Sequence, residues 1–285
     1  MAATPKPASY FKGRTGYRPD FLGDGSAVAL PALSEDLLAD VAKLDDGSYE
    51  LRYEHFSTAQ SMSRRMPLFS ACNVDGASGK SLPRYDTWSY DGRIDKQYQM
   101  LREACGDQGE QKFSRGHMTR RQDPNWGALE TAQQANIDTF TATNVCPQWQ
   151  PFNDGLWGDL EDYILLNAQG DSKRVSVITG PFLRPDDPKR FEILVPRDFW
   201  KVVAFISEAT GQLSCIAYMM SQGEYLDTGV ANDLEDFKLS QRPLSYIEQH
   251  TGLTFTDLAG KDVFDGVDLT FVQPIRRVGD TKLAA

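Results

Sequence analysis

The sequence predicts an α+β fold, in which helices and long loops are inserted between strands. Residues 174–182, 190–206 and 212–222 are rich in β-branched and aromatic side chains, which are typical of buried strands. Helix patterns with capping residues occur before these strands. The two patterns do not alternate regularly, so a parallel sheet built from βαβ units is not predicted.

The first third of the chain is predicted to form one short helix and a pair of strands. An amphipathic stretch at 28–44 is expected to be helical, with Ser34 as its N-cap. Residues 49–76 predict a strand, a Ser/Thr turn and then an apolar strand that ends at an Asp-Gly pair. The polar residues 77–112 are expected to be loops, with a short helix at 97–104.

The centre of the chain is predicted to alternate between helix and strand. Residues 127–148 begin with helix-forming residues, and their Asn/Thr-rich second half predicts a turn into a strand. Residues 151–170 predict one helix, with Asn153 and the next residue as cap candidates and Gly170 as its end. A short helix is predicted at 245–255, before a polar tail.

The length of 285 residues suits one large domain with a sizeable core. No repeat or linker divides the chain, so we expect an extended N-terminal arm over residues 1–23 and a single domain over residues 24–285. No apolar run approaches the roughly 18 residues of a membrane-spanning helix, so no membrane partner is expected. No signal segment is visible at the N-terminus, which leaves a cytoplasmic protein and an exported effector as alternatives.

The chain is acidic, with a formal net charge of -10. Such a charge argues against a protein that coats nucleic acid over a broad surface. The charges are segregated, however, as a focused site for an anionic substrate requires. Basic residues cluster at 64–65, 115–121, 189–190 and 276–277, and acidic residues cluster at 35–50 and 224–236.

The cysteines Cys72, Cys105, Cys146 and Cys215 are widely spaced and form no CxxC pair, so a zinc site is disfavoured. Cys72 and Cys215 lie in apolar runs, where a small buried hydrophobic residue is expected. The absence of a secretory signal favours free thiols over two disulfides.

His117 lies within a run of arginines, KFSRGHMTRRQDPNWG. Histidine is neutral and basic near physiological pH, because its ordinary pKa is about 6.5. Arg115, two residues earlier, would share one side of an extended segment with His117 and could hold a phosphate. A base beside an anion-binding group suits attack by water on a phosphodiester.

A metal ion commonly stabilises the leaving oxygen in such a reaction, and Mg²⁺ prefers oxygen ligands. Asn153 offers an amide oxygen at a predicted helix start, and Glu161 lies about 80° further round the same helix, two turns along. The pair could hold a hydrated Mg²⁺, with one direct ligand and one contact through water. On spacing alone, an asparagine at a helix start is more often a cap than a metal ligand, and Glu161 could be a solvated surface residue.

Taken in order, three motifs resemble the DNA/RNA non-specific endonuclease family of the ββα-metal (His-Me finger) superfamily, which is endonuclease G-like. That family carries D-R-G-H, then N-x-x-P-Q, then N-x-x-x-W-x-x-L-E. The corresponding residues here are RGH at 115–117, NVCPQ at 144–148 and NDGLWGDLE at 153–161. SLPRYDTW at 81–88 resembles the family's phosphate-binding arginine segment, and 193–203 resembles its P-x-x-F-[WF]-K signature.

The resemblance implies a ββα-metal nuclease fold, with a central, mostly antiparallel sheet flanked by helices and long loops. It also implies that the chain hydrolyses DNA and RNA and leaves 5′-phosphate ends. His117 would be the general base. Asn153 would be the direct protein ligand of Mg²⁺, Mn²⁺ or another divalent cation, and Glu161 would contact that metal through water.

The remaining implied roles concern the phosphate. Arg84 and Arg115 would bind the scissile phosphate, and Asn136 would line the substrate site. Asn144 would orient the catalytic set, which comprises His117, Arg115, Asn144 and Glu161. Contacts to phosphate rather than to base edges would give little sequence preference.

One position departs from the family pattern, since Ser114 stands where the family has Asp. If that Asp braces the loop, serine can replace it through a hydrogen bond to the local backbone. If its charge tunes the histidine, a weakened homologue that only binds nucleic acid or protein is the alternative. A second copy of the chain and an inhibitor or immunity protein are further partners that the sequence leaves open.

Overall fold

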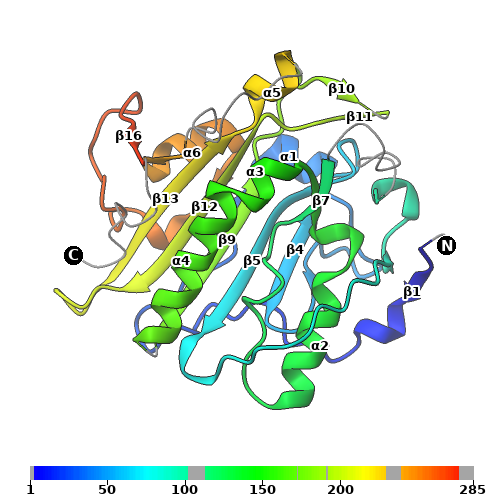
Figure 1. Cartoon of the computed structure of the whole chain (residues 1–285), viewed down its shortest axis with the longest axis horizontal. Coiled ribbons are helices and arrows are strands. Elements are labelled where there is room, and N and C mark those ends of the chain that lie inside the picture. Colours follow the sequence, from blue (N-terminus) through cyan, green and yellow to red (C-terminus); the bar gives the residue numbers. More distant parts are fainter. Residues whose placement is uncertain (1–2, 102–112, 172, 191, 229–238, 276–285) are drawn as a thin grey trace.

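A computed structural model describes residues 3–101, 113–171, 173–190, 192–228 and 239–275. Its centre is an eight-stranded sheet, and every neighbouring pair in that sheet is antiparallel (Figure 1). The predicted α+β class and the mostly antiparallel sheet are therefore confirmed. The strand order is β16 (Gln273–Pro274), β14 (Ser240–Arg242), β13 (Leu213–Ser221), β12 (Asp198–Ile206), β9 (Arg174–Pro181), β5 (Pro67–Asp75), β4 (Phe56–Gln60) and β3 (Leu51–Arg52).

The two faces of the sheet carry separate hydrophobic clusters. Side chains alternate along a strand, so Phe199 and Val203 of β12 face one cluster while Trp200 and Val202 face the other. Lys201 lies between them on the face of Phe199, although it is charged and only 1% exposed. A buried lysine on an apolar face needs a partner, and Glu161 of the helix that covers this face supplies one.

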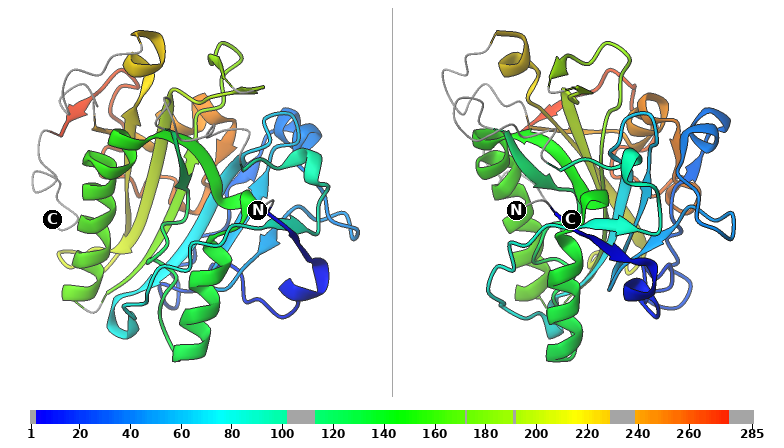
Figure 2. Two further views of the ribbon diagram at one scale, coloured as in Figure 1. Left: turned by 45° about the vertical axis from the view of Figure 1, so that its right-hand side comes forward. Right: turned by 90° about the vertical axis from the view of Figure 1, so that its right-hand side faces the viewer.

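Helices cover both faces. Helix α4 packs on the face of Phe199, and α6 packs on the opposite face, so the sheet separates the two in the right-hand view of Figure 2. Helix α2 lies on the same side as α4 (Figure 1). The bounds are α1 (Glu35–Asp40), α2 (Leu129–Thr139), α3 (Gln150–Asp154), α4 (Leu156–Gly170), α5 (Gly223–Thr228) and α6 (Leu244–Thr251).

A separate antiparallel pair of strands, called the hairpin below, lies outside the central sheet. Strand β7 (Phe113–His117) pairs antiparallel with β8 (Val145–Trp149), so that His117 is opposite Val145. Helices α3 and α4 follow β8 directly. Two strands and a helix thus follow one another as a ββα unit, with α2 inserted between the strands. The other two-stranded sheets are β1 (Pro5–Pro7) with β6 (Tyr90–Gly92), β2 (Ala32–Leu33) with β15 (Leu253–Thr254), and β10 (Lys189–Arg190) with β11 (Ile193–Leu194).

The segment predicted to be an N-terminal arm is packed against the rest of the chain. Strand β1 pairs in parallel with β6, and Tyr17 and Phe21 are buried in the cluster under α6. The backbone N–H of Gly16 donates to the carbonyl of Tyr53. The division into an arm and a single domain stays a prediction.

Several predicted elements are confirmed, and two are wrong. Ser34 caps α1, and its hydroxyl accepts from the N–H of Leu37. The expected Ser/Thr turn is instead strand β4, whose five residues are all buried. The single helix expected at 151–170 is two helices, because Gly155 breaks it with φ −93° and ψ −135°.

The break at Gly155 changes the role of Asn153. Asn153 is the fourth residue of the short helix α3 and caps neither helix, whereas α4 ends at Gly170, as predicted, with Asp171 as its C-cap. The helix predicted at 97–104 overlaps only a 3₁₀ turn, which spans Lys96–Tyr98. Residues 102–104 of that prediction lie outside the described residues.

Three of the four cysteines, Cys72, Cys146 and Cys215, are buried free thiols. Cys105 lies outside the described residues. Among the helices of the described part of the chain, none is both long and apolar enough to span a membrane.

Candidate active site

A cleft of about 320 Å³ lies where the hairpin meets the two helices that follow it. Three segments line it: the loop before β6, the end of β7 with the turn after it, and the helices α3 and α4. The lining residues are Arg84, His117, Arg120, Arg121, Gln122, Asn153, Asp154, Gly158, Asp159, Glu161 and Asp162. The cleft therefore brings together His117, Arg84, Asn153 and Glu161, which the sequence predicts to share a site.

His117 is the last residue of β7, and its ring packs between two aromatic side chains. The ring centroid of Trp88 lies 4.8 Å away and that of Phe140 lies 5.0 Å away. No donor or acceptor among the described residues reaches the buried Nε2 of His117. Burial, together with the positive charges of Arg84, Arg121 and Arg115, lowers the pKa of His117 to about 3. The imidazole is therefore neutral near pH 7.

The glycine before this histidine is required sterically. A Cβ at Gly116 would lie 1.8 Å from Oε1 of Gln148, whose side chain extends across β7. Any other residue would have to displace the side chain of Gln148 beside His117. The local sequence Gly-His thus fixes the position of the imidazole.

Asn144 is fully buried and does not line the cleft. Its Oδ1 accepts from the N–H of Thr119 at 2.8 Å and from Ser70 Oγ at 3.1 Å. Its Nδ2 donates to the carbonyls of Thr119 at 2.9 Å and Thr139 at 3.1 Å. These bonds connect the turn after His117 to β5 and to the end of α2. Asn144 is therefore placed to orient His117 rather than to touch a substrate.

The basic side of the cleft consists of Arg84, Arg120 and Arg121. Arg121 Nη1 donates to the carbonyl of Leu82 at 3.0 Å, so it supports the loop that carries Arg84. Asn136, which was expected to line the site, lies instead behind the same loop. It is buried and donates from Nδ2 to the carbonyl of Pro83 at 2.9 Å. Asn136 thus positions Arg84.

The acidic side of the cleft consists of Asp154, Asp159, Glu161 and Asp162, all on α3 or α4. With three arginines opposite four carboxylates, the lining has a formal charge of -1. A lone phosphodiester would be repelled from this side, whereas a divalent cation would make the lining positive.

The donor set suits a hard cation such as Mg²⁺. Nδ2 of Asn153 donates to Asp154 at 3.0 Å, and no donor among the described residues reaches its amide oxygen. That oxygen and the carboxylates of the acidic side are the ligands that Mg²⁺ prefers. Within the described residues, no group of three or more His, Cys, Asp or Glu side chains is arranged to hold a metal ion, so a cation in the cleft would have few protein ligands and would keep most of its waters.

Glu161 is held by two cations. Lys201 Nζ lies 3.4 Å from its Oε1 and donates to Thr179 Oγ1 at 2.8 Å. Arg120 Nε lies 3.9 Å from its Oε2, and Arg120 also pairs with Asp162. The orientation of the Glu161 carboxylate is thus fixed from the sheet and from the turn after His117.

Four residues of this region were not predicted to belong to the site: Arg120, Arg121, Asp123 and Lys201. The arginines belong to the basic cluster at 115–121, and Lys201 belongs to the run that resembles a family signature, so both signals were visible. Asp123 is buried close to Arg120 and Lys201, and burial raises its pKa to about 7. Nothing in the local sequence indicates its burial.

Arg115 and Ser114 lie outside the cleft lining. The guanidinium of Arg115 is 5.4 Å from the ring centroid of Trp88, so Trp88 contacts both Arg115 and His117. Ser114 Oγ donates to the backbone carbonyl of Gln148 at 3.1 Å, as a residue that braces the hairpin would. The other two histidines have structural contacts: His55 stacks on Trp126, and His250 stacks on Tyr246.

Comparison with known proteins places this cleft in context. The sequence model described as DNA/RNA non-specific endonuclease matches residues 33–262. The uncharacterized protein y4fB of Sinorhizobium fredii is 38% identical over 91% of this chain and 42% of its own length. Human mitochondrial endonuclease G is 30% identical over 50% of this chain and 48% of its own length.

The chain spans about half or less of the length of these relatives. A solved EndoG in complex with EndoGI covers 74% of this chain and 86% of its own, with a TM-score of 0.57 and 21% identity. That likeness confirms the ββα-metal fold.

Proposed function

The chain belongs to the DNA/RNA non-specific endonuclease family, and from this premise we propose that it is a metal-dependent endonuclease of DNA and RNA. One observation carries the proposal. A neutral His117 with an unpartnered Nε2 lines the same cleft as the three arginines and the free amide oxygen of Asn153. A base, an anion-binding side and a metal ligand thus line one cleft.

In the proposed reaction, His117 accepts a proton from a water molecule while the oxygen of that water forms a bond to phosphorus. The P–O3′ bond breaks, the leaving 3′ oxygen takes up a proton from a second water molecule, and the phosphate remains on the 5′ end of the other fragment. Arg84 and Arg121 bind the phosphate oxygens and stabilise the charge that develops on them. We place Arg115 next to the phosphate as well, through its position beside Trp88.

Asn153 would hold the metal directly, and Glu161 would contact it through water. A bound Mg²⁺ or Mn²⁺ would act as a Lewis acid toward the phosphate and the leaving oxygen. Lys201 and Arg120 keep Glu161 in one orientation. Because these groups recognise phosphate, little sequence preference is expected.

The alternative function, a weakened homologue that only binds, depends on Ser114. The hydrogen bond from Ser114 to Gln148 supports the bracing role and therefore favours the enzyme. An inhibitor or immunity protein remains a proposed partner, in keeping with the solved EndoG/EndoGI complex, and so does a second copy of the chain.

The test is incubation of the chain with supercoiled plasmid and with total RNA, with Mg²⁺ or Mn²⁺ and with EDTA. We expect both substrates to be cut with metal and neither with EDTA, and Asn153→Ala should need far more metal than the parent. Mapping of the ends should give 5′-phosphates. Binding without cleavage under every metal condition would favour the alternative, and recovery of cleavage by Ser114→Asp would establish it.

A further inference from the structure

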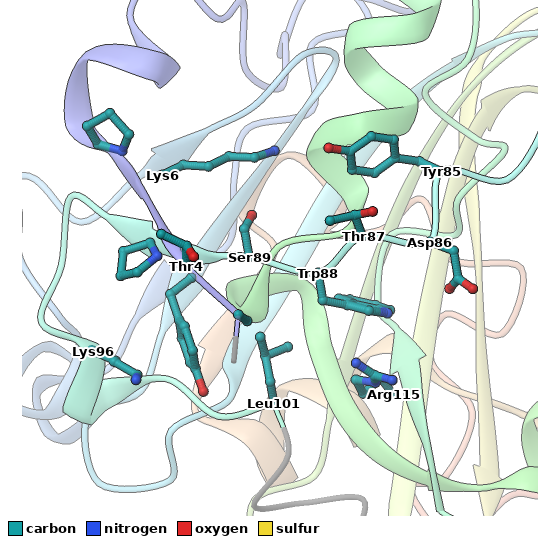
Figure 3. A pocket seen from close by; sticks show the side chains of 14 residues that line it. Thr4, Lys6, Tyr85, Asp86, Thr87, Trp88, Ser89, Lys96, Leu101 and Arg115 are labelled. Carbon is teal, nitrogen blue, oxygen red and sulfur yellow. The ribbon is translucent and has the colours of Figure 1, made fainter. Parts of the chain in front are cut away.

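A second and larger hollow is lined by Trp88, whose ring centroid lies 4.8 Å from that of His117 in the cleft. This groove has a volume of about 840 Å³ and lies between the N-terminal residues 3–7 and residues 85–90 (Figure 3). Ligand pockets commonly span roughly 300–1,000 Å³, so the groove has room for a base with its sugar. Arg115, two residues before His117, lines it.

The groove is basic in an acidic chain. Its lining carries Lys6, Lys96 and Arg115 against the single carboxylate of Asp86, which is 3.2 Å from Arg84. The lining therefore has a formal charge of +2, whereas the whole chain has -10. A polyanion is the ligand that this charge favours.

Each cation of the groove lies near an aromatic ring. Lys6 Nζ is 5.8 Å from the ring centroid of Tyr85, Lys96 Nζ is 4.6 Å from that of Tyr90, and Arg115 lies against Trp88. Figure 3 shows Lys6 and Tyr85 reaching toward each other across the groove. Tyr85 is 38% exposed, so part of its side chain is accessible. Cations beside accessible aromatic faces are typical of sites for unpaired nucleotides.

An unsatisfied polar group points to a ligand independently. Ser89 lines the groove and is only 5% exposed, yet its hydroxyl has no hydrogen-bond partner among the described residues. A buried hydroxyl without a partner is costly. A phosphate or sugar oxygen in the groove would satisfy it.

We propose that this groove binds unpaired nucleotides next to the scissile phosphate, so that the chain prefers single-stranded nucleic acid. The inference rests on the proposed function, because Trp88 of the groove packs against His117, the proposed base. A base can stack on Tyr85 only when it is unpaired, since the faces of bases in a duplex are already stacked. A duplex would therefore gain nothing from Tyr85.

The test measures binding by fluorescence anisotropy in the full chain carrying His117→Ala, with a labelled oligothymidylate and a duplex of equal length. Tyr85→Ala should raise the Kd for the single strand about tenfold and leave the Kd for the duplex nearly unchanged, as loss of one stacked base predicts. Tyr85→Phe keeps the ring and should bind like the parent. Lys96→Gln should reduce the slope of log Kd against log salt by about 0.7, the value for one phosphate contact.

Lys43→Gln is the matched control, because Lys43 is exposed and outside the groove, and it should bind like the parent. Unchanged binding in both Tyr85→Ala and Lys96→Gln would overturn the inference, as would equal weakening for single strand and duplex. The binding measurements, which all use the His117→Ala chain, do not require cleavage. A wild type that cuts nothing would therefore refute the proposed function while leaving the groove open to this test.

Discussion

The ion pair between Lys201 and Glu161 connects the central sheet to the acidic side of the cleft, and its removal should destabilise the fold. The ammonium is 1% exposed and lies 3.4 Å from the carboxylate, whose side chain is 12% exposed. Lys201→Met keeps most of the volume and removes the charge. Glu161 then retains only the more distant Arg120, at 3.9 Å, at a place with little water.

The magnitude follows from these distances. Two unit charges 3.4 Å apart attract by about 5 kcal/mol at an effective dielectric constant of about 20. The cost of removing both groups from water offsets part of this attraction, whereas loss of one partner of a buried pair costs roughly 3–5 kcal/mol. Arg120 and the partial exposure of Glu161 reduce the loss, so we expect Lys201→Met to lower the free energy of unfolding by about 3 kcal/mol.

The assay is a double-mutant cycle by urea denaturation, with Lys201→Met, Glu161→Gln and the double variant. The double variant should be more stable than the sum of the single effects predicts, by about 1–3 kcal/mol. Lys173→Met is the matched control, because Lys173 pairs at the surface with Asp171 and Glu208 and should cost at most about 1 kcal/mol. Additivity of Lys201→Met and Glu161→Gln within about 0.5 kcal/mol would refute the reasoning.

The remaining predictions concern the hairpin and its histidine. Asn144→Ala should lower the free energy of unfolding by about 3 kcal/mol, because it strands four buried hydrogen-bonding groups; unchanged stability would argue against its positioning role. Gly116→Ala should lower the melting temperature, and Gln148→Ala should restore part of it by relieving the contact; a stable single variant would contradict this. Arg84→Ala should raise the pKa of His117 above about 3 in an NMR titration, since Arg84 is the cation that lowers it most. The folded-state pKa lies below the ordinary 6.5, so stability present above pH 6.5 should be lost as the pH falls toward 3, and His117→Gln should flatten that loss.

Local patterns predicted the parts of the site that lie on single elements. Side-chain alternation along β7 places Arg115 and His117 on one side, and both indeed contact Trp88. The order of the three motifs also predicted that His117, Asn153 and Glu161 would meet, and all three line the cleft.

Contacts between elements far apart in the sequence could not be predicted in this way. The pairing of Lys201 with Glu161 depends on which face of β12 lies under α4, which no local pattern specifies. Strand β4 has the polar composition of a turn, yet all five of its residues are buried. Ser57 donates to Glu50, and Gln60 donates to the carbonyl of Tyr98.

The central claim is that the cleft around His117 cuts phosphodiester bonds. The most direct measurement is the rate of plasmid cleavage by His117→Ala, with and without added imidazole, beside His250→Ala as a control at an exposed histidine outside the cleft. The account predicts a loss of at least about 100-fold, partial recovery with imidazole, and wild-type cleavage by the control. Cleavage by His117→Ala at the wild-type rate would contradict it.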